Sequence, residues 1–600
     1  MSIERRPLVM GLVLGGLSAL MFALSFPGVS WWPLAFVAIT PLVVLAMRTE
    51  KPARSALGVF VAWLPALGYL QQFAWTSSVA GFFPLVLYTA LYPAAFVWIF
   101  GRLCGRFAKR PMVCAIVIAP VLWTGLEVLR GEIVWHGYPW YLAGQPTVAW
   151  DCYSGTASVI GMYGVGWMTL VASSGLAVGL GSARSARRAS RLAASSIALA
   201  AILGGCAIGS CATMSEAKSL IRRINTGPLV RIAVVQTNVP QSIKNEWTFE
   251  KAADDFARFL KLSQEVAQQQ PKPDLIIWPE TMFPGMALNA EAIEAQRKSG
   301  LGFRGSGQPL TVFYDALLEF QQSLGVPMLV GSEAIEGLKF ITNEDGSVKI
   351  ETSARYNSAF LIRGGVVAER YDKMHLTPFG EEMPYISAWP WLEKKLMAIG
   401  AEGMSFELRR GTSPTVFEVP IARHGRGTEE RSAARFVAPI CFETTLTGLC
   451  RALVFGGASP HDRRAELMVN ITNDGWFYTW RGGRECHMQF ARWRCIELGT
   501  PMVRAANTGV SCVIDSVGYV MDRRPQQWFK NADTPIEGVL TVDVPLGMGG
   551  PTAYVRWGWV FPWVCLGAGA ILTMLAFVPR RGGSKSYATA GAGTNGAKSS

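Results

Sequence analysis

The chain has 600 residues, half of them hydrophobic and only 16% charged, whereas soluble proteins carry charge on about a quarter of their residues. The net charge is +13, but no zinc-finger, helix-turn-helix or RNA-binding signature accompanies it, which argues against a nucleic-acid-binding protein. The eleven cysteines form no CxxC pair and show no metal-ligand spacing, so we expect neither a disulfide framework nor a zinc site.

Apolar windows predict eight membrane-spanning helices, because several are about 20 residues long, the length that crosses roughly 30 Å of hydrocarbon. The first window follows two arginines as a signal peptide would, but no small-residue cleavage site follows Phe26, so we expect a retained span. The windows are residues 8–26, 32–47, 56–73, 80–100, 112–129, 159–180, 192–211 and 557–578.

The loops between these windows predict how the helices are oriented. Lys and Arg cluster in the loops after the second, fourth and sixth windows and after the eighth, while loops 27–31 and 75–79 hold none. Because basic loops stay in the cytoplasm, we expect both termini there and residues 212–556 on the outer side. Buried core helices would not produce this consistent alternation.

Residues between the seventh and eighth windows show the sequence pattern of an α/β domain, in which short β-branched runs alternate with amphipathic stretches. Residues 249–270 and 485–498 are predicted helices, and 285–308 and 422–435 are predicted loop insertions of unassigned role. The predicted strands are residues 230–236, 275–278, 328–331, 436–441, 467–471 and 539–544. We therefore expect a membrane domain of seven helices at 1–212, a catalytic domain at 225–550, an eighth span at 555–580 and a disordered cytoplasmic tail at 581–600.

Three segments at the ends of predicted strands carry groups suited to acyl transfer. They read WPET from 278, YDKMH from 371 and PICFE from 439, and they supply Glu280, Lys373 and Cys441. A thiol must lose its proton before it attacks a carbonyl, and a nearby glutamate can accept that proton. A protonated lysine can lower the thiol pKa and hold the oxyanion that forms. Each residue alone could equally pack or face water, so the evidence is their joint occurrence in this order.

These segments resemble the nitrilase superfamily, whose Glu–Lys–Cys triad occurs in the same chain order. The stretches NITNDGWF from 470 and RAANTG from 504 also fit that superfamily. The resemblance implies an α-β-β-α sandwich with Glu280 as general base, Lys373 as oxyanion stabiliser and Cys441 as nucleophile.

Longer motifs narrow the resemblance to the apolipoprotein N-acyltransferases. They are VQTNVPQ from 235, KMHLTPFGEE from 373, PICFET from 439 and LRGEIVWHGYPW from 129, which is similar to the family's arm between spans five and six. The resemblance implies supporting roles for Glu381, Phe442 and Glu443. One departure is that Asn245 and Glu246 follow Lys244 before Trp247, so the family's tryptophan role is not assigned to Trp247. His375 is expected to pack or orient the lysine loop, and the aromatic residues 135–141 to form an interfacial belt or to line a lipid entrance.

This family resemblance implies an enzyme of the bacterial inner membrane with its catalytic domain in the periplasm. It implies a phospholipid acyl donor, a thioester on Cys441 and the diacylglyceryl-modified N-terminal cysteine of an apolipoprotein as acceptor, without a cofactor. Two alternatives are a membrane-anchored amidase that uses water as acceptor and an inactive nitrilase domain that serves as a scaffold. The presence of all three triad residues argues against the scaffold.

Overall fold

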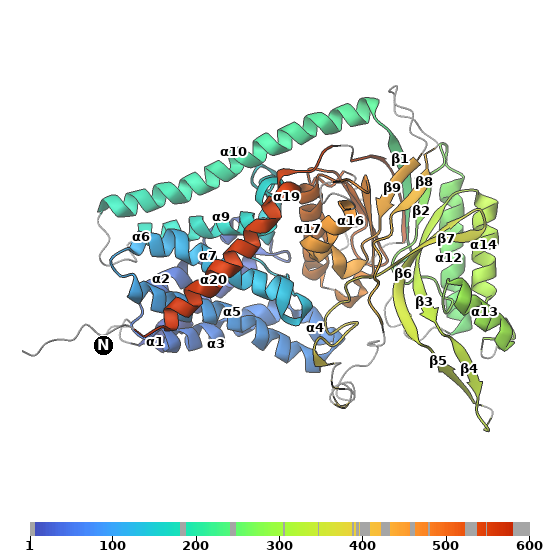
Figure 1. Cartoon of the computed structure of the whole chain (residues 1–600), viewed down its shortest axis with the longest axis horizontal. Helices are drawn as coiled ribbons and strands as arrows, with labels where there is room; N and C mark the ends of the chain where they lie inside the picture. The colour runs from blue at the N-terminus through green and yellow to red at the C-terminus, as the bar shows by residue number, and fades with distance from the viewer. Residues whose placement is uncertain are drawn as a thin grey trace, which may run out of the picture.

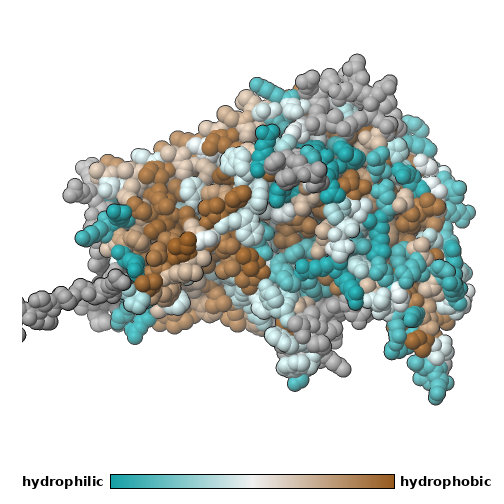
Figure 2. Space-filling model, viewed as in Figure 1, coloured by the Kyte–Doolittle hydropathy of each residue, from teal (hydrophilic) through white to brown (hydrophobic). Residues whose placement is uncertain are grey.

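The structure, a computed structural model, describes residues 6–180, 188–239, 248–303, 306–345, 347–386, 408–421, 433–456, 462–477, 480–521, 537–547 and 549–579, together with Trp389, Trp391 and Lys395. Figure 1 shows a helical bundle beside an α/β domain, with α20 (Phe561–Phe577) lying across the bundle. In Figure 2 the hydrophobic surface gathers over the bundle and the hydrophilic surface over the α/β domain. The predicted tail at 581–600 and Trp247 lie outside the described residues.

Within the described residues, seven helices are long and apolar enough to cross a membrane. These spans are Pro7–Ser25, Pro52–Leu70, Gly81–Arg106, Pro111–His136, Ala157–Gly179, Ala189–Ile221 and Gly558–Phe577. The elements that build the bundle are α1 (Pro7–Ser25), η2 (Trp32–Phe36), α2 (Thr40–Arg48), α3 (Pro52–Leu70), α4 (Gln72–Ser77), α5 (Val79–Arg106), α6 (Pro111–Val113), η3 (Cys114–Ile118), α7 (Ala119–Val128), η4 (Leu129–Ile133), η5 (Val134–His136), η6 (Gln145–Ala149), α8 (Asp151–Ser154), α9 (Ala157–Gly179) and α10 (Arg188–Thr226). The predicted windows thus correspond to helices.

The second predicted window differs from the others, because it forms a short 3-10 turn, η2, followed by the nine-residue helix α2. The whole apolar segment Trp32–Arg48 is shorter than the other seven. Pro33 and Pro41 each lie in the first turn of their element, where proline starts a helix but cannot continue the preceding one. The window is therefore a broken, buried helix rather than one continuous span.

Small residues allow the first helices to pack closely. A Cβ on Gly11 of α1 would lie 2.3 Å from the carbonyl oxygen of Ser55, and one on Gly58 of α3 would lie 2.5 Å from that of Leu8. Close backbone approach at glycine is a common way for helices to associate in lipid, where burial of apolar surface gives little driving force.

The α/β domain contains two sheets and a separate hairpin. The six-stranded sheet has the order β13-β1-β2-β3-β6-β7, the five-stranded sheet has the order β12-β11-β10-β9-β8, and β4 pairs with β5. The strands are β1 (Leu229–Gln236), β2 (Leu275–Ile277), β3 (Met328–Glu336), β4 (Lys339–Thr342), β5 (Val348–Glu351), β6 (Ala354–Arg363), β7 (Val366–Asp372), β8 (Phe417–Pro420), β9 (Ala433–Val437), β10 (Leu467–Thr472), β11 (Met502–Ala506), β12 (Cys512–Ile514) and β13 (Gly538–Pro545). β1, β2 and β3 are mutually parallel, as are β9, β10 and β11.

The two sheets pack face to face and each carries helices on its outer face, which gives the four layers expected from the sequence (Figure 1). One apolar core joins the sheets, with residues such as Val230 and Ile232 of the first meeting residues such as Val437 and Met468 of the second. The helices of this domain are α12 (Phe249–Ala267), α13 (Ala290–Ser299), α14 (Val312–Leu324), η8 (Cys441–Thr445), α16 (Thr447–Val454), η9 (Asp474–Phe477), α17 (Arg481–Leu498), α19 (Ala553–Arg556) and η10 (Gly558–Val560).

Two of the sequence predictions need correction. The segment 285–308 was predicted to be a loop, but it contains α13, which buries Ala292 and Ile293 and ends at Gly300 with a φ of 63°. Good helix formers between the flanking glycines outweigh the loop signal of the glycines themselves. The second insertion is shorter than predicted, because residues 433–435 belong to β9 and residues 422–432 lie outside the described part of the chain.

The α/β domain contacts the bundle mainly through α17. Trp493 donates a hydrogen bond of 3.2 Å to the carbonyl oxygen of Gln145, and the Glu497 carboxylate accepts one of 2.7 Å from the backbone N–H of Met162. Phe490 and Trp493 belong to the same apolar core as α1, α5 and α9. This continuous core fixes the α/β domain to the bundle.

Candidate active site

Glu280 lies just beyond the carboxyl end of β2 and is 5% exposed. Its Oε1 accepts a hydrogen bond of 2.7 Å from the Asn357 side chain, and its Oε2 accepts one of 2.8 Å from the backbone N–H of Asn473. The loop approaches β3 closely, since a Cβ on Gly331 would lie 2.3 Å from the carbonyl oxygen of Pro279. Both sheets therefore hold this carboxylate in place.

Lys373 follows β7 and is 1% exposed. Its Nζ lies 2.6 Å from Glu381 Oε2 and 3.6 Å from Glu280 Oε1, and Thr377 Oγ1 is 3.4 Å away. Burial opposes the charge on Lys373, but Glu381 and Glu280 outweigh it and raise the lysine pKa above its usual value. Burial likewise opposes the charge on Glu381, yet Lys373 holds the pKa of that carboxyl below its ordinary value. The pair is thus a buried ion pair.

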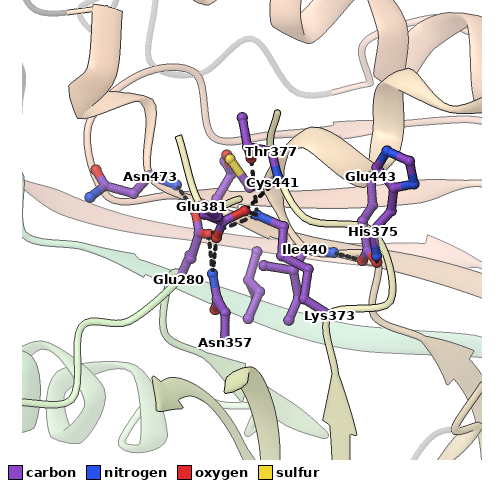
Figure 3. Close-up of polar contacts among 12 residues, drawn as sticks. Glu280, Asn357, Lys373, His375, Thr377, Glu381, Ile440, Cys441, Glu443 and Asn473 are labelled. Atoms are coloured by element: carbon purple, nitrogen blue, oxygen red, sulfur yellow. Dashed lines mark hydrogen bonds and ion pairs between the residues drawn. The ribbon is translucent and has the colours of Figure 1, made fainter. Parts of the chain in front are cut away.

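Cys441 begins the 3-10 turn η8, directly beyond the strand end at Val437, and is partly exposed. Its φ of 50° lies in the left-handed region, which is uncommon for a non-glycine residue and occurs often at active sites. Figure 3 shows its sulfur close to the cluster formed by Glu280, Lys373 and Glu381. The structure therefore brings together the three residues that the sequence predicted.

The environment of Cys441 favours the neutral thiol. Burial raises the pKa of the thiol above its ordinary value, Glu280 raises it further, and Lys373 opposes these two effects only in part. Lys373 thus lowers the thiol pKa, as expected, but the net shift of that pKa is upward. A group that accepts the thiol proton is consequently needed before this sulfur can act as a nucleophile.

Glu443 joins the nucleophile turn to the lysine loop. Its Oε1 accepts hydrogen bonds of 2.7 Å and 3.0 Å from the backbone N–H groups of Met374 and His375, and its Oε2 accepts one of 2.7 Å from that of Ile440 (Figure 3). Burial raises the pKa of Glu443 to about 7, although these backbone donors oppose the shift. Glu443 is therefore a positioning residue for both loops.

Phe442 and His375 pack together beside this link, as expected for a histidine that orients the lysine loop. Phe442 is buried and its ring stacks on that of His375 with centroids 6.0 Å apart and an interplanar angle of 21°. Burial and the nearby Arg410 lower the pKa of His375 to about 4. His375 is therefore neutral at ordinary pH and serves as a packing surface.

A second buried cluster touches the backbone of Cys441. His487 Nε2 lies 3.2 Å from the carbonyl oxygen of Cys441, and its Nδ1 lies 2.9 Å from Asp474 Oδ1. Arg504 donates to both oxygens of Asp474 at 2.8 Å, and both side chains are fully buried. Burial opposes the charge on Asp474, but Arg504 and His487 hold its pKa well below the usual range. A Cβ on Gly509 would lie 2.3 Å from this carboxylate, which explains the glycine in the RAANTG stretch.

The segment from 129 to 140 reaches from the bundle to the lysine loop. His136 Nδ1 lies 2.7 Å from Glu382 Oε1, and the Trp135 ring packs against Phe379 with centroids 5.3 Å apart. The predicted interfacial belt is wrong for Trp140 and Tyr141, which are 4% and 1% exposed. Trp140 is buried against Phe477 and Phe490 of the α/β domain, and Tyr141 is buried within the bundle against Phe26.

Sequence reasoning missed several residues of the site. The side-chain amide of Asn357 donates one hydrogen bond to Glu280 and another, of 3.0 Å, to Glu381, so it bridges the two carboxylates. The sequence feature that could have indicated it is the single asparagine in the largely buried strand β6, where an unpaired polar side chain would be costly. His487 occupies the predicted helix now seen as α17, but nothing in its local sequence marks its contact with Cys441.

Comparison with known proteins shows which family the chain belongs to. Residues 231–554 match the family model for carbon-nitrogen hydrolases, which is more than half of the chain. The chain belongs to the carbon-nitrogen hydrolase family. Residues 18–175 match a second model, the apolipoprotein N-acyltransferase N-terminal domain. A carbon-nitrogen hydrolase domain on a membrane bundle of this kind confirms the resemblance expected from the motifs.

Whole-length relatives agree with these domain matches. An apolipoprotein N-acyltransferase of Geobacter metallireducens is 29% identical over 96% of both chains. A protein of the same name from Rhodopseudomonas palustris is 28% identical over 92% of this chain and 91% of its own. Among solved structures, a mutant nitrilase-superfamily amidase of Nesterenkonia AN1 aligns over 56% of this chain and 95% of its own at 14% identity, with a TM-score of 0.33. Bacterial relatives and apolar helices together identify a multi-pass bacterial membrane protein.

Proposed function

We propose that this carbon-nitrogen hydrolase is an apolipoprotein N-acyltransferase. It moves an acyl chain from a membrane phospholipid to the amino group of the diacylglyceryl-modified cysteine at a lipoprotein N-terminus. The observation that carries the proposal is the Glu280–Lys373–Cys441 cluster, placed on a membrane bundle whose first domain matches the family model of that name. Both substrates are anchored in lipid, so their enzyme must work at the bilayer surface.

In the first step Cys441 attacks the ester carbonyl of the phospholipid. Glu280 accepts the thiol proton, the new bond joins Sγ to the carbonyl carbon, and Lys373 stabilises the oxyanion. The ester C–O bond then breaks, and the lysophospholipid oxygen leaves with the proton that Glu280 returns. The raised thiol pKa supports this order, because a neutral thiol gains nucleophilicity only when the base acts.

In the second step the acceptor amine attacks the thioester. Glu280 now accepts a proton from the amine, the C–S bond breaks, and the amide forms while Cys441 recovers its proton. Lys373 stabilises this second oxyanion as well, and the raised lysine pKa keeps it charged through both steps. Glu381, Asn357 and Glu443 hold the lysine and its loop in position.

For the orientation, we propose that the catalytic domain lies in the periplasm and both termini in the cytoplasm. Arg102 and Arg106 of α5 donate hydrogen bonds of 2.9 Å and 3.0 Å to the carbonyl oxygens of Ala576 and Leu575 at the end of α20. The basic end of α5 and the end of α20 therefore share one face of the bundle, in support of the loop-charge argument. Reporter fusions at Arg106 and within 212–556 should report opposite compartments, and equal compartments would contradict this orientation.

The activity is tested with the purified protein in nanodiscs, a phospholipid carrying a labelled acyl chain and a diacylglyceryl-cysteine peptide. We expect the label to appear as an amide on the peptide, and we expect Cys441→Ser to abolish it. If the label is released only as free fatty acid while the peptide stays unmodified, the chain is a hydrolase and the transferase proposal is wrong.

A further inference from the structure

A cavity of about 220 Å³ lies outside the triad, where the α/β domain meets three membrane-spanning helices. Glu132 of η4 and Tyr163 of α9 line one part of it, Arg451 of α16 lines another, and Trp559 and Trp563 line a third. These elements come from both domains, so the cavity occupies the seam between them. Figure 1 shows α16, α19 and the first turns of α20 close together at this seam.

The cavity lies at the ends of three spans, and Tyr163 is near the start of the span Ala157–Gly179. Glu132 is near the end of the span Pro111–His136, and Trp559 and Trp563 are near the start of the span Gly558–Phe577. Trp563 is 44% exposed, and tryptophan at a span end marks the depth of the lipid head groups. The cavity therefore opens at head-group level rather than into bulk water.

Two opposite charges line this cavity without meeting. The Arg451 guanidinium lies over the Trp559 ring, 4.4 Å from its centroid, and its buried Nε has no hydrogen-bond partner. Glu132 Oε1 accepts a hydrogen bond of 2.9 Å from the Tyr163 hydroxyl. Among the described residues, neither Arg451 nor Glu132 takes part in an ion pair with a neighbour. A charge in such surroundings that lacks a paired counter-ion is costly even when it is hydrogen-bonded, so a ligand that supplies both counter-charges would be stabilised.

We propose that this cavity binds the head group of one zwitterionic phospholipid, with its phosphate on Arg451 and its ammonium on Glu132. The planar guanidinium suits a phosphate, and aromatic faces favour a cationic amine. The acyl chains of this lipid lie along the exposed apolar side of η10 and α20, where Val560 of η10 is 41% and Val564 of α20 is 60% exposed. The bound lipid fills the seam between the catalytic domain and the eighth predicted span. This inference does not depend on the transferase reaction.

Native mass spectrometry of the delipidated full-length protein tests the site with dialkyl ether phospholipids, which bind but cannot donate an acyl chain. With the ethanolamine lipid we expect Arg451→Gln to retain one lipid fewer than the parent, or to bind it at least 10-fold more weakly. Glu132→Gln should weaken the ethanolamine lipid while leaving the glycerol head-group lipid unchanged. Arg363→Gln, at the C-terminal end of β6, is the matched control and should behave as the parent.

Equal lipid retention by Arg451→Gln and the parent would overturn the proposal. So would displacement of the lipid by millimolar inorganic phosphate, which would show a simple anion site. If Arg451→Gln melts at a lower temperature without lipid, its weaker binding could reflect lost stability, and the Glu132→Gln result is used instead. Loss of the preference for ethanolamine over glycerol head groups in Glu132→Gln supports the site, and an unchanged preference refutes it.

Discussion

Two buried charged clusters surround Cys441, and they differ in whether their charge can move. In the first, Lys373 faces Glu381 and Glu280, and Glu280 also faces a neutral thiol. In the second, Arg504 and His487 hold Asp474, and His487 contacts the backbone carbonyl oxygen of Cys441. A proton can pass from Cys441 to Glu280 without changing the net charge of the first cluster. The second cluster has no such exchange, and it holds the strained backbone of the nucleophile.

This difference shows why burial alone does not identify a catalytic charge. Asp474 and Arg504 are more deeply buried than Glu280 or Glu381, yet their charges are fully paired. Perturbed ionisable groups mark functional sites only in a statistical sense, because structural ion pairs are perturbed as well. The electrostatic effect on the Cys441 thiol, rather than the burial, distinguishes the two clusters.

The largest effect is expected from Glu280→Gln, which removes the proton acceptor and keeps the shape of the side chain. Loss of a positioned base costs about 10²–10⁴ in rate, and acyl transfer should fall by that factor. Labelling of Cys441 by a small thiol-reactive probe should become slow at neutral pH and recover only well above about 8.5, the ordinary thiol pKa, because burial raises the pKa of this thiol. Labelling as fast as the parent at neutral pH would exclude Glu280 as the base.

A smaller effect is expected from Glu381→Gln. Lys373 would lose its closest partner, and a displacement of about 1 Å in a catalytic group costs on the order of 10² in rate. Because Glu381 helps to raise the lysine pKa, its loss should lower that pKa and move the alkaline limit of activity to lower pH. The adjacent Glu382→Gln is the matched control, since Glu382 faces His136 and Arg410 instead of Lys373. Identical pH profiles for the two variants would refute this role for Glu381.

The smallest effect on the reaction itself is expected from Asp474→Asn, which should act on stability. The variant leaves the buried Arg504 guanidinium without its counter-charge, and breaking such a pair costs about 3–5 kcal/mol. We expect a melting temperature lower by several degrees, with nearly parental activity per folded molecule. Glu351→Gln, which breaks an exposed pair on the β4–β5 hairpin, should leave the melting temperature unchanged. An unchanged melting temperature with lost activity in Asp474→Asn would assign this cluster to the chemistry.

The sequence predicted the triad because Glu280, Lys373 and Cys441 each follow a strand end within a distinctive local motif. Asn357 could not be found in the same way, because its role depends on an antiparallel register that pairs β6 with β3 and β7. The contact of His487 with Cys441 joins residues 46 positions apart, which no local pattern records. Helix α13 was missed because glycines at its borders resemble a loop.

The sequence predicted the membrane domain about as completely as it predicted the α/β domain. Hydropathy located the helices, since lipid-facing and core-facing residues are both apolar. It could not show that the window 32–47 is broken ahead of Pro41, or that Trp140 is covered by the α/β domain. Both outcomes depend on packing between elements distant in sequence.

Mass spectrometry of the intact protein after incubation with phospholipid tests the central claim most directly. The account predicts that the parent gains the mass of one acyl chain, removable by hydroxylamine and located on Cys441. Cys450→Ser, nine residues further along and buried in α16, should keep the adduct, and Cys441→Ser should lose it. An adduct that persists in Cys441→Ser, or amide product formed without any adduct in the parent, would contradict the thioester mechanism.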